Sequence, residues 1–414
     1  MTAGLLAHGV GARTDLPLDT ATAVTGAVMA VLISIVAVNV LRPATREVAE
    51  PGRPVPHAVQ RLVDAPALRL VLRVVVLAAA LFVTVVALAG PAVPALNLAP
   101  WALYLTFWVS IVPVSLVLGP VWRAVNPLRT LHAAVERLAG LGSLAGTRPL
   151  PAALGWWPAA AWLALFVWLE LVHPDADEPR LVGTFLVTYG LTTLVLALVF
   201  GRGWFDRGDG FQACSTLIGR LSPFGRREDG RLVVRSPLEG LHRLRDEPGL
   251  VAVAVVLMGS TAFDGLTRTR PWQEEVDPSS IPLGTLGLAS MIGATALLHL
   301  AGTAVAGRLV REEPLPAAVA RVPVAVGAGG PDPDPAPPRA AGRPDPRRRL
   351  PGLFAASLVP IAVGYAVAHY ASLLLLEGQT TWILASDPFR TGADLFDTAA
   401  RQIDYRAISP AAIA

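Results

Sequence analysis

Eight stretches of the sequence are apolar and about as long as a helix must be to cross a bilayer. They cover residues 21–42, 70–90, 101–122, 153–172, 181–201, 249–266, 281–306 and 351–376. Because lipid offers no partner to an unpaired backbone group, each stretch is expected to be helical. The sequence therefore predicts an all-α fold, a polytopic transmembrane bundle of about eight spanning helices.

The composition agrees with this fold class. Hydrophobic residues make up 53% of the 414-residue chain and charged residues only 16%, with a mean hydropathy of +0.53. An ordinary soluble domain has about 25% charged residues, which it needs to cover its surface. The apolar excess predicts contact with a lipid bilayer. A net charge of +3, with its arginines scattered between apolar stretches, predicts no binding to nucleic acid.

The arginines set the orientation. If the N-terminus lies outside, the inner loops are 42–73, 123–150, 201–248 and 307–350, and they hold 27 of the 34 basic residues, all arginine. Such an excess on the cytoplasmic side follows the positive-inside rule. The sequence thus predicts a multi-pass protein of the plasma membrane, with the N-terminal segment 1–20 outside the cell.

The predicted membrane domain covers residues 21–310 and contains the first seven helices and the cytoplasmic loop 202–248. Residues 311–349 predict an extended cytoplasmic linker, because ten prolines lie between Pro314 and Pro346. The eighth helix is expected at 350–377, and 378–414 form an extracytoplasmic C-terminal segment.

One face of a helix in the loop 202–248 carries Phe211, Cys214, Leu217, Ile218 and Leu221. This spacing predicts a helix that lies along the membrane surface. We favour this over a catalytic role for Cys214, the only cysteine of the chain. The sequence has no Walker, GxSxG or strand-linked GxGxxG motif, so it gives no support to a nucleotide-driven pump or a standard serine hydrolase.

Several ionisable side chains fall at the outer ends of predicted spans, where an ionisable group suggests function. They are Glu170 and His173 at the end of the fourth stretch, Asp264 in the sixth, and Tyr365 and His369 on one face of the eighth. His8 precedes the first stretch on the same side. His299 falls instead in the inner half.

A divalent metal site of zinc, iron or manganese would suit these residue types, with His8, His173, Asp264 and His369 as ligands and Glu170 and Tyr365 as catalytic groups. The alternative is a solvated carboxylate at a helix end and a histidine bonded to a neighbouring helix. The sequence has no HExxH, HxH or DxD, so only the topology brings these residues together.

The chain also carries strings that resemble a known family. They include AHGVGARTDLPL, WVSIVPVSLVLGPVWRAVNPLRTL, WPAAAWLALFVWLELVHPDADEPRLVGTF, GSTAFDGLTRTRPW and SLVPIAVGYAVAHYASLLLLEGQ. Together they are similar to the actinobacterial multi-spanning proteins named fenitrothion hydrolase, over most of the chain outside the proline-rich linker. The resemblance supplies no catalytic residues. It implies a further spanning helix with histidines beyond YRAISP, so this chain is expected to be truncated after Ala414.

The resemblance implies hydrolysis of an organophosphate triester with a nitrophenolate leaving group, at the outer membrane face. A metal-bound hydroxide would serve as nucleophile, and Tyr365, Arg268 or Arg270 would stabilise the phosphoryl oxygen. Two alternatives stay open. The first is a transporter of a small solute or metal ion, for which the sequence shows no charged residue at mid-membrane. The second is a non-catalytic membrane component that binds a partner through the loop 202–248 or the outer tail.

Overall fold

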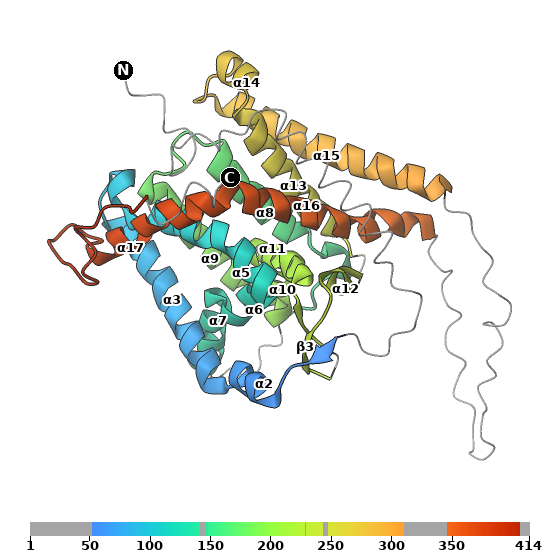
Figure 1. Ribbon diagram of the computed structural model, residues 1–414, viewed down its shortest axis with the longest axis horizontal. Helices are drawn as coiled ribbons and strands as arrows, with labels where there is room; N and C mark the ends of the chain where they lie inside the picture. The colour runs from blue at the N-terminus through green and yellow to red at the C-terminus, as the bar shows by residue number, and fades with distance from the viewer. Residues whose placement is uncertain are drawn as a thin grey trace.

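Seven helical segments of the computed structural model are long and apolar enough to cross a membrane, which confirms the predicted all-α polytopic bundle (Figure 1). The structure describes residues 52–138, 140, 146, 148–227, 229–242, 247–309 and 346–405. The predicted span 21–42, the segment 1–20 and most of the linker 311–349 lie outside the described residues. The seven segments are Pro66–Ala89, Leu98–Leu118, Ala152–Leu171, Pro179–Phe200, Leu250–Thr267, Ile281–Arg308 and Leu350–Ser386.

The first half of the described chain contains these elements: β1 (Arg53–Pro54), α2 (His57–Asp64), α3 (Pro66–Ala89), η1 (Pro94–Leu96), α4 (Leu98–Pro100), η2 (Trp101–Val109), α5 (Ser110–Leu118), α6 (Val121–Val125), α7 (Pro127–Leu138), η3 (Ala152–Leu154), α8 (Trp157–Leu171) and α9 (Pro179–Phe200). The second half contains these: η4 (Arg202–Trp204), α10 (Phe205–Gly208), α11 (Gly210–Ile218), η5 (Gly219–Leu221), β2 (Phe224–Arg226), β3 (Leu232–Val234), α12 (Pro237–His242), α13 (Leu250–Thr267), α14 (Arg270–Glu275), α15 (Ile281–Leu309), α16 (Pro346–Glu377) and α17 (Gln379–Ser386).

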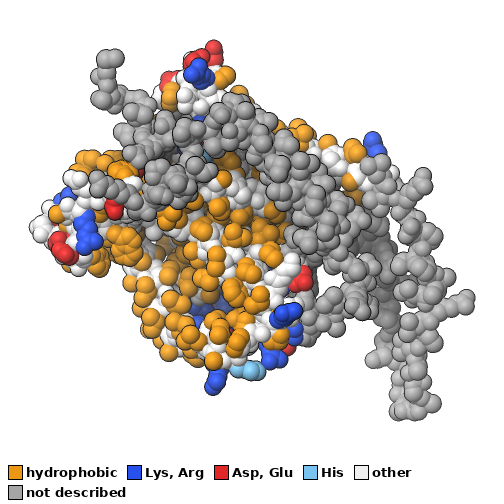
Figure 2. Space-filling view, in the orientation of Figure 1, with side chains coloured by type: hydrophobic (Ala, Val, Ile, Leu, Met, Phe, Trp, Pro, Cys, Tyr) orange, Lys and Arg blue, Asp and Glu red, His pale blue; other side chains and the backbone are white. Residues whose placement is uncertain are grey.

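Helix α3 shows why these segments are spans rather than core helices. Proline at its first position fixes a helical start. After Arg73, the residues up to Gly90 are apolar except for Thr84. Most of its large side chains are exposed, including Leu70 at 59% and Val75 at 58%. Figure 2 shows hydrophobic side chains spread over this face of the molecule. Such an exposed apolar surface suits a helix that crosses a membrane.

Helix α13 lies at the centre of the bundle, packed against α8, α15 and α16 (Figure 1). More than half of its residues are buried, the largest share among the seven spans. Gly259 allows α15 to approach closely, because a side chain there would meet the Ile292 backbone at 2.6 Å. Helix α13 corresponds to the stretch 249–266, the shortest of the predicted spans.

The second and seventh spans are irregular. The second has a π-helical half, Trp101–Val109, then a proline in α5, Pro113, and it ends at Gly119 with φ +85°. The seventh has Pro351 and Pro360 inside α16. Prolines remove backbone hydrogen bonds and π-helical turns are uncommon outside functional sites. Both irregular spans line the cavity described below.

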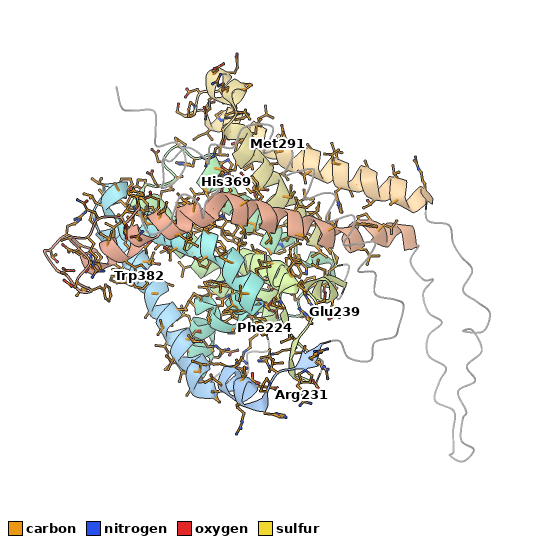
Figure 3. The ribbon with its side chains drawn as sticks, viewed as in Figure 1. Phe224, Arg231, Glu239, Met291, His369 and Trp382 are labelled. Atoms are coloured by element: carbon orange, nitrogen blue, oxygen red, sulfur yellow. The ribbon has the colours of Figure 1, made fainter. Side chains whose placement is uncertain are left out.

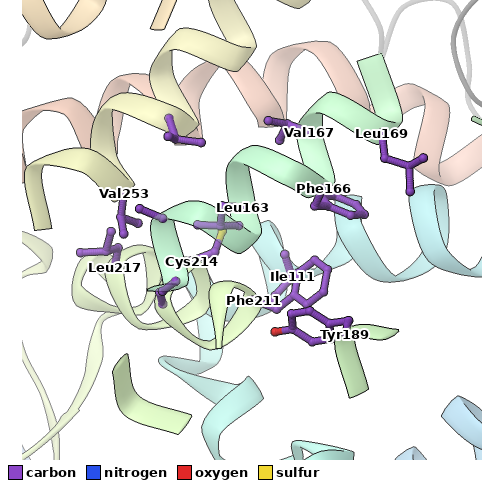
Figure 4. Packing of buried hydrophobic residues seen from close by; sticks show 14 of the residues in the cluster. Ile111, Leu163, Phe166, Val167, Leu169, Tyr189, Phe211, Cys214, Leu217 and Val253 are labelled. Atoms are coloured by element: carbon purple, nitrogen blue, oxygen red, sulfur yellow. The ribbon is translucent and has the colours of Figure 1, made fainter. Parts of the chain in front are cut away.

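The position of helix α11 contradicts the prediction that a helix in the loop 202–248 lies along the membrane surface. It lies inside the bundle between α5, α6 and α8, and Phe211, Cys214 and Leu217 are at most 4% exposed. Figure 4 shows Phe211 and Cys214 beside Leu163 and Phe166 of α8. The sequence identified the apolar face of α11 correctly, but the neighbouring helices cover its polar face as well. Surface placement was therefore wrong for these residues.

The polar face of α11 is tolerated because other elements satisfy it. The Asp209 carboxylate caps α11 by accepting from the Gln212 backbone N–H at 2.9 Å. It also accepts from the Tyr189 hydroxyl and the Asn126 side-chain amide, both at 2.6 Å. Burial raises the pKa of this carboxyl, against these stabilising hydrogen bonds.

A small antiparallel sheet, in the order β1–β3–β2, joins two of the predicted inner loops (Figure 1). Arg53 from the loop 42–73 pairs with Val234 from the loop 201–248. The two loops therefore lie on one side of the bundle, as the arginine distribution requires.

We expect Phe166→Ala to reduce the stability of the fold by about 3–5 kcal/mol. The Phe166 ring is 1% exposed, and its centroid lies 4.9 Å from that of Trp108 and 5.0 Å from that of Phe211. Unfolding in mixed micelles of rising denaturing-detergent content measures the change. Phe354→Ala, at a ring that is 46% exposed, is the control and should shift stability by less than about 0.5 kcal/mol. Equal losses in both variants would contradict the packing described here.

Candidate functional site

A cavity of about 70 Å³ lies within the bundle, between the second span, α8, α11, α13 and α16. Its wall is mostly apolar, and its carboxylates come from Glu170 and Asp264, with the Tyr370 hydroxyl nearby. A pocket with apolar walls and a few convergent polar groups is the usual form of a small-molecule site. Its lining residues include Trp108, Val112, Val167, Glu170, Cys214, Leu257, Ser260, Asp264, Val359, Ala366 and Tyr370.

The Asp264 side chain is enclosed and well partnered. It is 2% exposed, and its Oδ2 accepts from the Tyr370 hydroxyl at 2.6 Å and the Tyr365 hydroxyl at 3.1 Å. The guanidinium of Arg268, the residue that directly follows α13, lies 3.7 Å from Oδ1. Two hydroxyl donors and one cation compensate for the loss of water around this carboxylate.

His369 joins the same group from α16 (Figure 3). Its Nε2 lies 3.5 Å from Asp264 Oδ2. The imidazole ring stacks on Tyr365, with centroids 5.2 Å apart, and meets the Tyr370 ring edge-on at 4.7 Å. The i, i+4 spacing of Tyr365 and His369 places both on the face of α16 that meets α13. The predicted proximity of these two residues to Asp264 is therefore present in the structure.

Glu170 differs from Asp264 in its partners. It ends α8, is half-buried and faces the cavity. The Trp108 indole donates a hydrogen bond to its carboxylate, and the charge of Asp264 acts on it across the cavity. No side chain among the described residues forms an ion pair with it. A carboxylate has room for about four hydrogen bonds, so much of its capacity is unused.

The remaining predicted residues lie elsewhere or outside the described part. His173, in the turn after α8, accepts at Nδ1 from the Asp175 backbone N–H at 3.1 Å and packs against Trp168. Arg270 is exposed at the start of α14. His299 bonds the Pro351 carbonyl at 2.8 Å and so ties α15 to α16. His8 is not among the described residues.

Within the described part of the chain, no group of three or more His, Cys, Asp or Glu side chains is placed to hold one metal ion. His369 lies beside Asp264, and Asp264 shares the cavity wall with Glu170. His173 makes its own contacts in the turn. The metal site that included His8 stays a prediction.

The sequence analysis missed two members of this site, Tyr370 and Trp108. Tyr370 directly follows His369, and adjacent residues on a helix normally point about 100° apart. Here both neighbours contact Asp264. His369 Nε2 lies 3.5 Å from Asp264 Oδ2, and the Tyr370 hydroxyl donates to the same oxygen. Trp108 lies in the π-helical half of the second span, where the 3.6-residue period does not tell which side chains face the bundle.

Comparisons of the chain with protein-family models, with curated proteins and with solved structures find no match. The resemblance to fenitrothion hydrolases therefore stays a prediction.

Cys214 provides a reporter on this cavity. Burial raises the pKa of its thiol from 9.0 to about 12, so the thiolate fraction at neutral pH falls about a thousandfold. N-ethylmaleimide should label the folded protein about a thousand times more slowly than the unfolded chain, with the rate rising about tenfold per pH unit from 7 to 9. Mass spectrometry of the intact protein measures the rate. Labelling at equal rates before and after unfolding would show that the thiol is not enclosed.

Proposed function

We propose that this protein is a plasma-membrane transporter for a small, mainly apolar solute that carries one positive charge. The observation that carries the proposal is the Glu170 carboxylate, which faces an apolar cavity and has no ion-pair partner among the described residues. Intramembrane carboxylates are costly, and those that face a cavity commonly serve a substrate or ion pathway.

The chemistry of the cavity wall favours an ammonium group. Trp108 and Tyr370 place aromatic rings beside the carboxylates, and aromatic faces attract a desolvated cation. The other lining residues are largely aliphatic and suit an alkyl chain. Since one water needs about 10–15 Å³ of such volume, about 70 Å³ accommodates a solute of roughly five non-hydrogen atoms. A short alkylammonium ion meets these requirements.

The irregular spans favour transport over fixed binding. The span with the π-helical segment Trp101–Val109 and the proline of α5 lines one wall of the cavity, and α16, which contains two internal prolines, lines another. Interrupted helices beside a binding site are typical of transporters, because they bend where a continuous helix does not. Helix α11 closes one side of the cavity with Cys214 and Ile218.

We expect Glu170→Gln to weaken binding of butylammonium about 10- to 100-fold, because a hydrogen-bonded charge pair contributes about 1.5–3 kcal/mol. Calorimetric titration of the purified protein measures the affinity, and butylammonium uptake into proteoliposomes measures transport. Glu274→Gln removes the same charge at an exposed site on α14 and is the matched control. 1-Butanol, which has the same chain without the charge, should bind far more weakly. Equal affinities for the two ligands, or no effect of Glu170→Gln, would overturn the proposal.

The hydrolase implied by the resemblance is the second candidate, and the apolar cavity wall favours it. Glu170 would act as general base on a cavity water, with Tyr365 or Arg268 beside the phosphoryl oxygen. A nitrophenyl phosphate triester is several times larger than the cavity, so this reaction requires the helices to separate. Metal assistance would add zinc, iron or manganese held by Asp264 and His369.

For hydrolysis, nitrophenolate release from a nitrophenyl triester should exceed the vesicle background and fall at least tenfold in Glu170→Gln. Absorbance at alkaline pH measures the product. If a metal takes part, Asp264→Ala and His369→Ala should each lose bound metal, as elemental analysis would show. Turnover and metal content that stay unchanged in both alanine variants would exclude metal assistance through these residues.

A further inference from the structure

We propose that the inner end of α3 and the adjoining helix α2 form a binding surface for anionic phospholipid of the cytoplasmic leaflet. The observation is the juxtaposition of an exposed apolar face on α2 with a group of exposed arginines beside it. This surface lies at the opposite end of the molecule from His369; Figure 3 labels Arg231 near it. The inference is independent of the proposed transport function.

Helix α2 is amphipathic and directly precedes a membrane span. Val59, Leu62 and Val63, spaced i, i+3, i+4, share one face and are 45%, 64% and 41% exposed. Only Ala65 separates α2 from α3, which begins at Pro66. A short amphipathic helix joined to a span in this way lies in the interfacial layer, with its apolar face toward the acyl chains.

The opposite face of α2 is held against the small sheet. Asp64 bonds Arg226 of β2 and Arg69 of α3, and Arg226 holds the pKa of this carboxyl below its ordinary value. His57 lies 3.2 Å from an Arg231 nitrogen. These contacts fix the rotation of α2 and direct Val59, Leu62 and Val63 away from the protein.

The arginines around α2 outnumber the acids. We define the basic surface as Arg53, Arg61, Arg69, Arg226 and Arg231. Figure 2 shows blue and pale-blue side chains at this lower edge of the molecule. Asp64 is already shared between Arg69 and Arg226. Among the described residues, the guanidinium groups of Arg53 and Arg61 have no hydrogen-bond or ion-pair partner. Positive charge beside an exposed apolar face matches the phosphate and acyl chains of one lipid.

Native mass spectrometry tests the charge requirement. The purified full chain is titrated with equal amounts of phosphatidylglycerol and phosphatidylcholine. We expect phosphatidylglycerol to be preferred, and the double variant Arg53→Gln/Arg61→Gln to reduce that preference by about fivefold per arginine. Arg270→Gln/Arg390→Gln removes two arginines at exposed positions far along the chain and should leave it unchanged. Equal retention of both lipids, or equal effects of the two double variants, would overturn the proposal.

A depth measurement tests the apolar contact separately. In a Cys214→Ala background the chain has no other cysteine, so Leu62→Cys accepts a single nitroxide label. In phosphatidylglycerol nanodiscs the label should be more accessible to dissolved oxygen than to a water-soluble nickel complex, with the reverse for Gln60→Cys. If position 62 is as accessible to the nickel complex as position 60, α2 does not lie in the interface and the proposal fails.

Discussion

The structure depends on the rule that a polar group removed from water must find its partners within the protein. Two buried carboxylates illustrate it. Asp209 has a hydroxyl, a side-chain amide and a backbone N–H as donors. Asp264 has two tyrosine hydroxyls and the charge of Arg268. With these partners in place, α11 can enter the bundle and α13 can occupy its centre.

The spans were predictable because they are defined by a property of consecutive residues, the length of an apolar run. The length of an apolar run is read directly from the sequence, and only 11% of the apolar window of α3 and of α15 is buried inside the protein. The sidedness of the loops was predicted from the sequence in a similar way, since each arginine counts by itself. Strands β1 and β3 come from two such loops and pair with each other, as a common side of the membrane requires.

The position of α11 was not predictable from periodicity. Its sequence has an apolar face and a polar face, which is the pattern of a surface helix. What places α11 inside the bundle instead is the set of partners that its polar face finds there. Ser215 meets Ser115 at 2.8 Å, and Gln212 meets Arg129 at 2.7 Å. These contacts link residues 83 and more positions apart in the sequence, so no local pattern records them.

The candidate site was predictable in part for the same reason. Topology alone predicted Glu170, Asp264 and His369 at one end of the bundle. In the structure His369 lies 3.5 Å from Asp264, and Asp264 and Glu170 line one cavity. Tyr370 and Trp108 were missed because the choice between neighbouring positions on a helix depends on its rotation. That rotation is set by packing, for α16 by its contacts with α13, α15 and the π-helical segment.

The charge of the site bears on the choice between transport and hydrolysis. In attack on a phosphate triester, negative charge grows on the phosphoryl oxygen and needs donors aimed at it. At this cavity the Tyr365 and Tyr370 hydroxyls already donate to Asp264. The Arg268 guanidinium is 3.7 Å from the same carboxylate, and Glu170 adds a second carboxylate. A growing negative charge there would be repelled, whereas a positively charged solute would be attracted by the same groups. The electrostatics of the cavity therefore favour a cationic ligand over an anionic transition state.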